Sequence, residues 1–428
     1  MPHAHLPARA RSKTTPTPTP GKSEYVEGLT LAEAATLLNV DVHDPELTAA
    51  IFETARQIKA RIYGNRIVLF SPLYLASWCV NSCTYCAFRA GNKTLRRSAL
   101  TDAELVLEVE ALQRQGHRRL LVLTGEHPRY SFNQFLHALD VIAAVKTDPC
   151  GGIRRLNVEI PSLSVSDMRR LKATDKVGTF TLFQETYHRP TFARVHVSGP
   201  KSDYGHRLLT QDRALRAGLD DVGVGALFGL ADYRYEALGL LSHAQHLEAE
   251  YGAGPHTISI PRLRPADGSE LASAPPCPVD DAHFKALVAI LRIAVPYTGM
   301  ILSTRESPEM REALLQVGIS QMSAGSRTDV GGELCCLFSR VCLRMPLRSY
   351  RSRANSRVSH LHVAARCPPP SPQFHSPHPL SCRAPPSPSS CCLNLMPPPS
   401  PPSIQLPADP PPKTSPDTTK PDANSLPP

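Results

Sequence analysis

The chain has 428 residues, enough for two domains or for one large barrel with extensions. Its net charge is +9, but residues 1–22 carry +4 and the residues from 333 onward carry +6, which leaves −1 for residues 23–332. The excess of basic residues therefore lies at the two ends of the chain. The charge of the folded part gives no indication of nucleic-acid binding.

The first 24 residues have the composition of an organelle transit peptide. They are rich in Arg, Ser, Thr and Pro and contain no acid before Glu24. We expect import into the chloroplast, because this Pro and Thr content suits a mitochondrial amphipathic helix poorly. A mitochondrial or cytoplasmic protein with a disordered leader, or a misplaced start site, is the alternative.

Helical and apolar patterns alternate from about residue 25. A capping box of Thr30 and Glu33 predicts the start of the first helix, and a longer helix follows over 44–62. The apolar run over 66–76 predicts a buried strand, and a second capping box, Thr101 with Glu104, opens a helix over 102–115.

The same rhythm continues to residue 326. Seven further strands are expected at 118–126, 156–161, 179–187, 221–230, 256–263, 299–306 and 319–326, with helices over 132–146, 165–173, 211–217, 233–250, 281–294 and 308–316. Eight Val/Ile/Leu-rich strands joined through helices indicate an α/β protein with a parallel sheet. We predict a closed (β/α)8 barrel with an N-terminal helical extension, and a doubly wound open sheet is the alternative.

The composition breaks after residue 332, before the expected eighth helix. Of the 43 prolines, 23 lie between Pro346 and Pro428. We therefore expect three parts: a leader over 1–24, a barrel over 25–332, and a disordered Pro-rich tail over 333–428. The tail is interpreted as an artefact of the gene model, and a Pro-rich partner-binding tail is the other reading.

Cysteine usage points to a reducing compartment. Five of the twelve cysteines lie before residue 333 without the spacing of a disulfide framework, and no secretory signal precedes them. No apolar run approaches the roughly 20 residues that span a bilayer, so a soluble protein without a membrane partner is expected.

Three of these cysteines, Cys79, Cys83 and Cys86, form a C-x3-C-x2-C motif after the first strand. A structural zinc site needs four ligands, and Cys150 and Cys277 are isolated in the sequence. Three cysteines can instead hold a [4Fe–4S] cluster with one iron open to a chelating molecule. Free thiols without a role are the other possibility. A loop after a strand also lies at the barrel end where active sites assemble.

This motif, with Tyr85 before its last cysteine, resembles the signature of the radical S-adenosylmethionine (SAM) enzymes. The resemblance covers residues 25–332 and includes "LVLTGEHP", "LNVEIPSLS", "HVSGPKSDY" and "GPHTISIPRLRPA", which are similar to the tyrosine lyases of that superfamily. Two members compete, the thiamine-pathway 2-iminoacetate synthase and the iron–iron hydrogenase maturase of HydG type. The segments "SGPKSDY", "AGLDDVG" and "GPHTISIPR" favour the maturase.

The resemblance implies a carbon–carbon lyase. In the family, SAM bound to the open iron yields a 5′-deoxyadenosyl radical, and L-tyrosine is cleaved to p-cresol and dehydroglycine. In the maturase, dehydroglycine becomes the carbon monoxide and cyanide ligands of the hydrogenase active site. An electron donor such as ferredoxin or flavodoxin and other hydrogenase maturation proteins are the implied partners.

Site residues follow from matching motifs and from physical need. The three cysteines are expected to ligate the cluster, Tyr85 to border the adenine, and Glu126 to accept a hydrogen bond from the SAM ammonium. Glu159 and Glu185 end strands where their carboxylates can face SAM or the substrate ammonium, and solvated loop acids are the alternative. Arg305 suits the tyrosine carboxylate, with help from Ser303 and Ser323, although a structural ion pair is the alternative for Arg305.

Other sequence features give no prediction of a functional site. His243 and His246 are interpreted as packing and surface residues, and "GVGALFG" as a strand without phosphate-binding glycines. The family also carries an auxiliary iron–sulfur cluster, but the cysteines after residue 332 form no C-x2-C pair, so no ligands for it are assigned. A chain of this kind is expected to retain SAM and tyrosine chemistry without building the iron carbonyl–cyanide product. A catalytically impaired cluster-binding protein is the other hypothesis.

Overall fold

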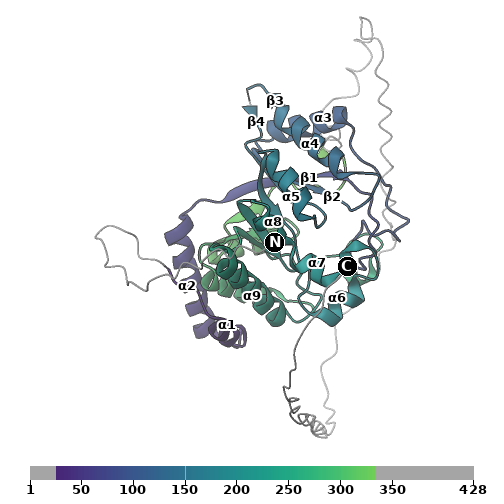
Figure 1. Cartoon of the computed structure of the whole chain (residues 1–428). Coiled ribbons are helices and arrows are strands. Elements are labelled where there is room, and N and C mark those ends of the chain that lie inside the picture. Colours follow the sequence, from purple (N-terminus) through teal and green to yellow (C-terminus); the bar gives the residue numbers. More distant parts are fainter. Residues whose placement is uncertain (1–25, 150, 334–428) are drawn as a thin grey trace, which may run out of the picture. The chain divides into compact units, whose positions relative to one another are not determined.

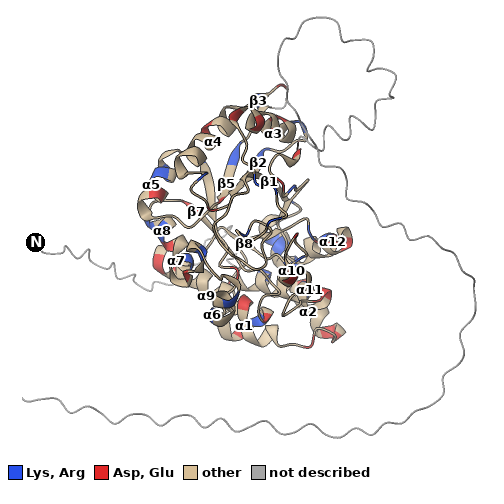
Figure 2. Ribbon diagram, turned by 90° about the vertical axis from the view of Figure 1, so that its right-hand side faces the viewer, with Lys and Arg blue, Asp and Glu red and all other residues tan. Residues whose placement is uncertain are grey.

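The computed structural model describes residues 26–149 and 151–333. Within this part of the chain, eight parallel strands close into a barrel in the order β1-β10-β9-β8-β7-β6-β5-β2. Helices surround the strands, as Figures 1 and 2 show. The predicted (β/α)8 barrel is therefore confirmed, and the open sheet is wrong.

The barrel strands all lie within the predicted ranges or within two residues of them. Their bounds are β1 Val68–Ala76, β2 Arg119–Thr124, β5 Arg155–Glu159, β6 Val177–Thr181, β7 Asp221–Gly225, β8 Thr257–Ser259, β9 Gly299–Leu302 and β10 Gln321–Ser323. Two further strands, β3 Lys146–Thr147 and β4 Gly151–Gly152, form a small antiparallel pair outside the barrel. These two-residue strands are too short to show a strand pattern in the sequence.

The long helices also match the predictions. They are α1 Leu31–Leu38, α2 Pro45–Tyr63, α3 Asp102–Arg114, α4 Phe132–Ala144, α5 Val165–Ala173, α8 Thr210–Arg216, α9 Tyr233–Tyr251, α11 Asp281–Ala294 and α12 Pro308–Val317. Both capping boxes, at Thr30 and at Thr101, are present and fix the starts of α1 and α3. No helix of the described residues is long and apolar enough to cross a bilayer.

Short elements in two long loops were missed. The chain between β6 and α8 forms α6 Arg189–Val195, the 3-10 turn η1 Pro200–Ser202 and α7 Tyr204–Leu208, and the chain between β8 and α11 contains α10 Glu270–Ser273. These elements are too short to show a helical period in the sequence. The predicted leader and the predicted tail lie outside the described residues, apart from Glu333, and the described residues after β10 contain no complete helix.

Alternation along the strands separates two faces of the barrel wall. Apolar residues such as Leu156, Val158 and Phe180 are buried in one core cluster with side chains of the surrounding helices. The opposite face is polar, because Arg155 donates to Thr179 and also pairs with Asp221. The lumen is thus a polar, partly charged space, and its upper end carries the candidate site.

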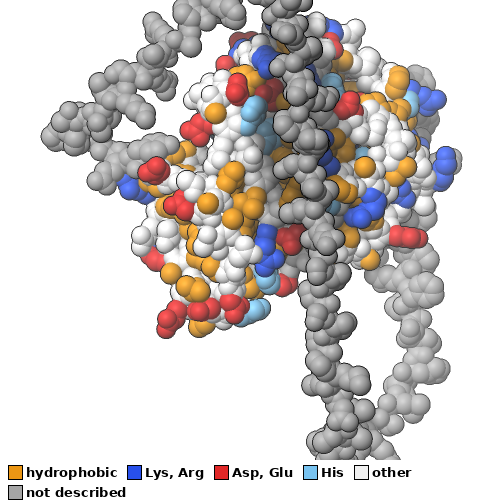
Figure 3. Space-filling view, turned by 60° about the horizontal axis from the view of Figure 1, so that its bottom comes forward, with side chains coloured by type: hydrophobic (Ala, Val, Ile, Leu, Met, Phe, Trp, Pro, Cys, Tyr) orange, Lys and Arg blue, Asp and Glu red, His pale blue; other side chains and the backbone are white. Residues whose placement is uncertain are grey.

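The surface outside the barrel shows no single apolar patch among the described residues. Their large exposed apolar side chains are Leu31, Leu47, Leu69, Leu107, Val197, Leu209, Tyr235 and Tyr297, which belong to many elements. On the face in Figure 3, hydrophobic side chains likewise lie in small groups between charged ones. Scattered apolar exposure of this kind is ordinary for a protein surface.

A buried arginine ties the last elements of the barrel together. Arg292 on α11 is fully buried, and its guanidinium donates to the carbonyls of Pro296 (2.8 Å), Thr298 (2.9 Å) and Gly318 (3.0 and 2.8 Å). The ring of Tyr63 lies 4.8 Å below it. The side chain therefore joins α11, the start of β9 and the turn before β10.

We expect Arg292→Leu to lower the free energy of unfolding by about 3 kcal/mol or more, because it leaves several buried carbonyls without a donor. Arg292→Lys should lose less, since it keeps a donor but not the planar fork. Thermal unfolding would measure both. Arg169→Leu at an exposed position of α5 is the control, and an equal loss in that variant would contradict the assignment.

Candidate active site

The three predicted cluster ligands lie on the loop that follows β1. Cys83 is buried, Cys79 and Cys86 are half-buried, and none of them forms a disulfide. Burial raises the pKa of the Cys83 thiol to about 11 and also raises that of Cys86. The charges of Cys79 and Cys86 act on Cys83, and the charge of Cys79 acts on Cys86, so the three thiols share one electrostatic environment along the loop.

A second segment of the chain, residues 195–201, holds this loop through its backbone. The Thr84 N–H donates to the Val195 carbonyl and the Ser82 N–H to the Ser198 carbonyl, both at 2.9 Å, and Cys83 forms an antiparallel bridge with His196. The cysteine loop has no regular structure of its own, so these contacts fix its path.

Asn81 connects three parts of the site. Its Nδ2 donates to Glu126 Oε2 at 2.7 Å and lies 3.6 Å from Cys79 Sγ, while its Oδ1 accepts the Lys201 N–H at 2.9 Å. Gly199 packs on the same side chain, since a Cβ there would lie 2.4 Å from Asn81 Oδ1, and its φ of +96° also favours glycine. Neither residue was singled out from the sequence, although "SGPK" was noted as a resemblance.

Glu126 follows β2 and faces the cysteine loop, as its predicted role requires. Its backbone carbonyl accepts the Val80 N–H at 2.8 Å, and its side chain lines a cavity of about 390 Å³. The walls are mostly apolar and include Val80, Tyr130, Phe132, Phe135, Ile160 and Leu163. One carboxylate oxygen is already bonded to Asn81, so the other is the one available to a ligand.

Glu185 is paired with two cations of the chain itself, both through one carboxylate oxygen, and its predicted contact with an ammonium stays a prediction. Its carboxylate pairs with Lys201 Nζ at 2.6 Å and with Arg207 Nη2 at 3.5 Å. Burial alone would raise the pKa of Glu185, but these two cations hold it below its ordinary value. The residue also has a left-handed φ of 71°, which is unusual for a non-glycine residue and is frequent at functional sites.

Tyr85 is buried against the same segment. Its hydroxyl lies 2.8 Å from His196 Nε2, and Lys201 Nζ lies 5.6 Å from its ring centroid. Burial, together with the nearby Lys201 charge, lowers the pKa of His196 to about 3, so the imidazole is neutral. Lys201, Arg207 and His196 are thus site residues that sequence reasoning missed. The predicted contact of Tyr85 with an adenine stays a prediction.

Glu159 ends β5 with its carboxylate toward the lumen. It makes no hydrogen bond or ion pair with the other described residues. Burial raises its pKa to about 7, with a further contribution from the negative charge of Glu185, while Lys201, Arg207 and Arg305 act in the opposite direction. An unpaired, half-buried carboxylate beside the cysteine loop fits a ligand that carries positive charge.

Arg305 lies in the turn after β9 and is exposed at the mouth of the barrel. The Arg305 N–H donates to Ser303 Oγ at 3.3 Å, and the Thr304 N–H donates to Ser323 Oγ at 3.2 Å. Both predicted serines therefore shape the turn that carries the arginine.

The guanidinium of Arg305 has no ion pair among the described residues, yet it is close enough to influence Tyr74 and Glu159. The alternative prediction for Arg305 is a structural ion pair. In this turn the adjacent acid forms ion pairs, but with other arginines. Glu306 is paired with Arg262 and with Arg264. Arg305 thus remains available to a substrate carboxylate.

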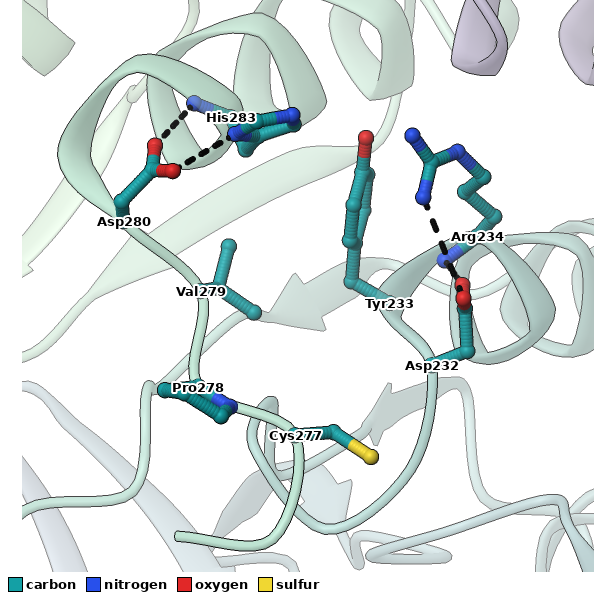
Figure 4. A pocket seen from close by; sticks show the side chains of 8 residues that line it. All are labelled: Asp232, Tyr233, Arg234, Cys277, Pro278, Val279, Asp280 and His283. Carbon is teal, nitrogen blue, oxygen red and sulfur yellow. Dashed lines mark hydrogen bonds and ion pairs between the residues drawn. The ribbon is translucent and has the colours of Figure 1, made fainter. Parts of the chain in front are cut away.

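Two other sequence features lie away from this site. His243 contacts the hydroxyl of Tyr187 at 3.0 Å and His246 pairs with Asp212 at 2.8 Å, which confirms their packing role. Cys277 lines a separate cavity of about 260 Å³ beside the first turns of α9 and α11, shown in Figure 4. Asp280 and His283, on another wall of that cavity, pair with each other.

The residues present fit a [4Fe–4S] cluster and SAM better than a single metal ion. The described residues contain no group of three or more His, Cys, Asp or Glu close enough to hold one ion. A cube instead takes thiolates at separate corners, which suits three cysteines spread over one loop. Cys79, Cys83 and Cys86 would hold the cluster, the free oxygen of Glu126 suits the ammonium of SAM, and the unpaired Glu159 suits a further positively charged ligand group.

Comparison with known proteins indicates the class of enzyme that uses a [4Fe–4S] cluster with SAM. Residues 73–237 match the model of the radical SAM superfamily, and residues 259–361 match the Biotin and Thiamin Synthesis associated domain. The chain belongs to the radical SAM enzymes, whose cofactors are a [4Fe–4S] cluster and SAM. Within them it belongs to the family of 2-iminoacetate synthase: it is 34% identical to that protein from Escherichia coli strain K12 over 283 residues, which cover 65% of this chain and 72% of the relative.

Solved structures add a second group of relatives. A crystal structure of HydG, a maturase of the [FeFe]-hydrogenase, is 50% identical with a TM-score of 0.69, covering 72% of this chain and 66% of that one. HydG from Carboxydothermus hydrogenoformans is 44% identical with a TM-score of 0.66, covering 72% and 70%. The chain thus spans about two thirds of the length of these relatives.

We expect Gly199→Ala to destabilise the folded chain by about 1–3 kcal/mol and to reduce its iron content after anaerobic reconstitution, because the new Cβ strains the backbone and displaces Asn81. Thermal unfolding and iron analysis would measure these effects. Gly91→Ala is the control, since nothing lies within 4 Å of a Cβ there. Equal iron content in the two variants would show that the close approach of Asn81 does not support the loop.

We expect Glu159→Gln to stabilise the cluster-free chain at pH 8 and to have little effect near pH 4. The pKa of Glu159 is raised to about 7 by burial, so the wild-type fold loses stability as the pH rises from the ordinary carboxyl range through 7. Glutamine removes this loss. Unfolding at both pH values would test it, with Glu312→Gln on the exposed face of α12 as control; a gain that is the same at both pH values would contradict the assignment.

Proposed function

We propose that this chain cleaves L-tyrosine between Cα and Cβ to give p-cresol and dehydroglycine. The observation that carries the proposal is the pair of unmatched charges at the mouth of the barrel, the Glu159 carboxylate and the Arg305 guanidinium, above a three-cysteine loop. An amino acid carries the two complementary charges. Similarity to 2-iminoacetate synthase and to HydG supports the same substrate.

When bound, the cluster held by Cys79, Cys83 and Cys86 together with SAM would supply the radical chemistry for hydrogen-atom abstraction from the substrate. The chain's own residues bind and orient. Arg305 holds the tyrosine carboxylate through its planar fork, on a turn shaped by Ser303 and Ser323. Glu126 would accept a hydrogen bond from the SAM ammonium, and Glu159 would pair with the ammonium of tyrosine. The buried Glu185 and Arg207 and the half-buried Lys201 form a charge cluster beside Tyr85.

We further propose that the dehydroglycine serves hydrogenase maturation rather than thiamine synthesis. The identity to the HydG structure is 50%, against 34% to 2-iminoacetate synthase. The cysteines after residue 332 lie outside the described residues and form no C-x2-C pair. We therefore infer that this chain on its own does not form the iron carbonyl–cyanide product of the maturase.

The experiment is anaerobic reconstitution with iron and sulfide, followed by incubation with SAM, L-tyrosine and Ti(III) citrate. We expect p-cresol and 5′-deoxyadenosine in equal amounts, both absent in Cys83→Ala, and no carbon monoxide. 5′-Deoxyadenosine without p-cresol would contradict tyrosine cleavage and favour the impaired-enzyme hypothesis. Release of carbon monoxide would contradict the inference about the missing product step.

A further inference from the structure

The segment after the last cluster cysteine is strongly basic. Residues 77–101 contain four cations, Arg89, Lys93, Arg96 and Arg97, and no acid. Elsewhere, Figure 2 shows that acids and bases are interspersed on the outer helices. We refer to residues 89–97 as the basic loop. It is a local concentration of positive charge in a folded region that is otherwise close to neutral.

The basic loop folds directly onto the cysteine loop. The Ala90 N–H donates to the Asn81 carbonyl at 2.8 Å, and the Arg89 N–H donates to the Cys86 carbonyl at 3.2 Å. The guanidinium of Arg97 donates to the carbonyls of Ser77 and Phe88, both at 2.7 Å. The positive charge of this loop is therefore held within a few residues of the cluster ligands in space as well as in sequence.

Asn92 fixes the conformation of the basic loop. It is buried, its Nδ2 donates to the carbonyls of Ala87 (2.8 Å) and Asp267 (3.1 Å), and its Oδ1 accepts the Thr94 N–H at 3.1 Å. Gly268 packs against it with a left-handed φ of +70°, and Arg89 donates to the Gly268 carbonyl. The loop is thus a defined surface docked on the turn before α10.

The two cations at the tip of the basic loop are free to meet a partner. Lys93 and Arg96 are exposed, and neither is paired with an acid in the described part of the chain. By contrast, the guanidinium of Arg97 donates to backbone carbonyls, including those of Ser77 and Phe88. The adjoining turn contributes the exposed acids Asp267 and Glu270, and with the four cations of the basic loop these two acids leave a net charge of +2.

We propose that the basic loop is the docking surface for an acidic one-electron carrier protein that reduces the cluster. This inference rests on the proposed radical SAM chemistry, which requires one electron from outside the chain. The donor gives up one electron and is oxidised, a flavodoxin hydroquinone to its semiquinone, and the cluster passes from [4Fe–4S]2+ to [4Fe–4S]+. Opposite charges bring such partners together faster and in the right orientation.

A nucleic acid is the other polyanion that a basic loop could bind. The structure favours the protein donor, because only Lys93 and Arg96 are both exposed and unpaired here, whereas specific nucleic-acid binding commonly uses about 6–10 phosphate contacts. The position of the loop directly on the cysteine loop also serves electron delivery and has no evident use in phosphate recognition.

The test is the variant Lys93→Glu with Arg96→Glu in the full, reconstituted chain. Stopped-flow absorbance would follow cluster reduction by an acidic flavodoxin hydroquinone. We expect the second-order rate constant to fall about tenfold at low ionic strength and the difference to shrink at about 0.5 M salt. Calorimetry with the cluster-free chain should show weaker flavodoxin binding by a similar factor. Reduction by Ti(III) citrate should not change.

The control is Lys146→Glu with Arg169→Glu, which reverses two exposed cations that lack an acid partner within the described residues. An equal fall in this control, or an unchanged rate in the loop variant, would overturn the proposal. Binding of a single-stranded oligonucleotide to the unmodified chain would also overturn the proposal, if the loop variant lost this binding but was still reduced by flavodoxin at the normal rate. Absence of p-cresol with Ti(III) citrate would instead refute the lyase function, and the reduction rates would still test the docking surface.

Discussion

The site depends on the backbone pairing between the cysteine loop and residues 195–201. A loop of three cysteines without regular structure cannot hold its thiols in place, because each residue must lose backbone freedom at a cost of about 1–2 kcal/mol. Here Thr84 and Ser82 are bonded to the carbonyls of a second segment, and Cys83 bridges His196. Asn81 of the cysteine loop packs directly against Gly199 of the second segment, with no room for a Cβ between them. The path of the cysteine loop is therefore fixed by this segment, which joins the end of α6 to η1.

The same segment supplies the electrostatics of the barrel mouth. Lys201 neutralises Glu185, its charge also acts on His196 and on Glu159, and its ammonium lies 5.6 Å from the centroid of the Tyr85 ring. Glu185 is thus paired with two cations, while the half-buried Glu159 has no partner among the described residues and a pKa of about 7. This division of roles between two carboxylates leaves one anionic position and one cationic position, Arg305, for ligands. The lumen below them is polar but internally bonded through Arg155 and Asp221.

The architecture was predictable from the sequence because local signals and the fold agree. Capping boxes at Thr30 and Thr101 mark helix starts, and apolar runs such as 66–76 mark buried strands. The cysteine spacing, the carboxylates at strand ends and the arginine after β9 were also found. All of these features are short-range patterns, and a parallel barrel brings the ends of its strands together by its topology alone.

The partners of those residues were not predictable, since they depend on contacts between distant parts of the chain. Tyr85 and His196 are 111 residues apart, and Asn81 and Lys201 are 120 apart. That Glu185 is paired while Arg305 is free depends on which acid and which base the loops bring together. Arg262 and Arg264 both pair with Glu306, and the neighbouring Arg305 has no acidic partner among the described residues. The short helices α6 and α7 were not predicted because they are too short to show a helical period in the sequence.

The central claim is that Cys79, Cys83 and Cys86 hold a cluster with one iron open to SAM. Electron paramagnetic resonance of the reduced, reconstituted chain tests it most directly. We expect a [4Fe–4S]+ signal whose g values shift when SAM is added, and no such signal in Cys83→Ala. A signal that is the same with and without SAM would contradict an open iron, and a signal that survives in Cys83→Ala would contradict the ligand assignment.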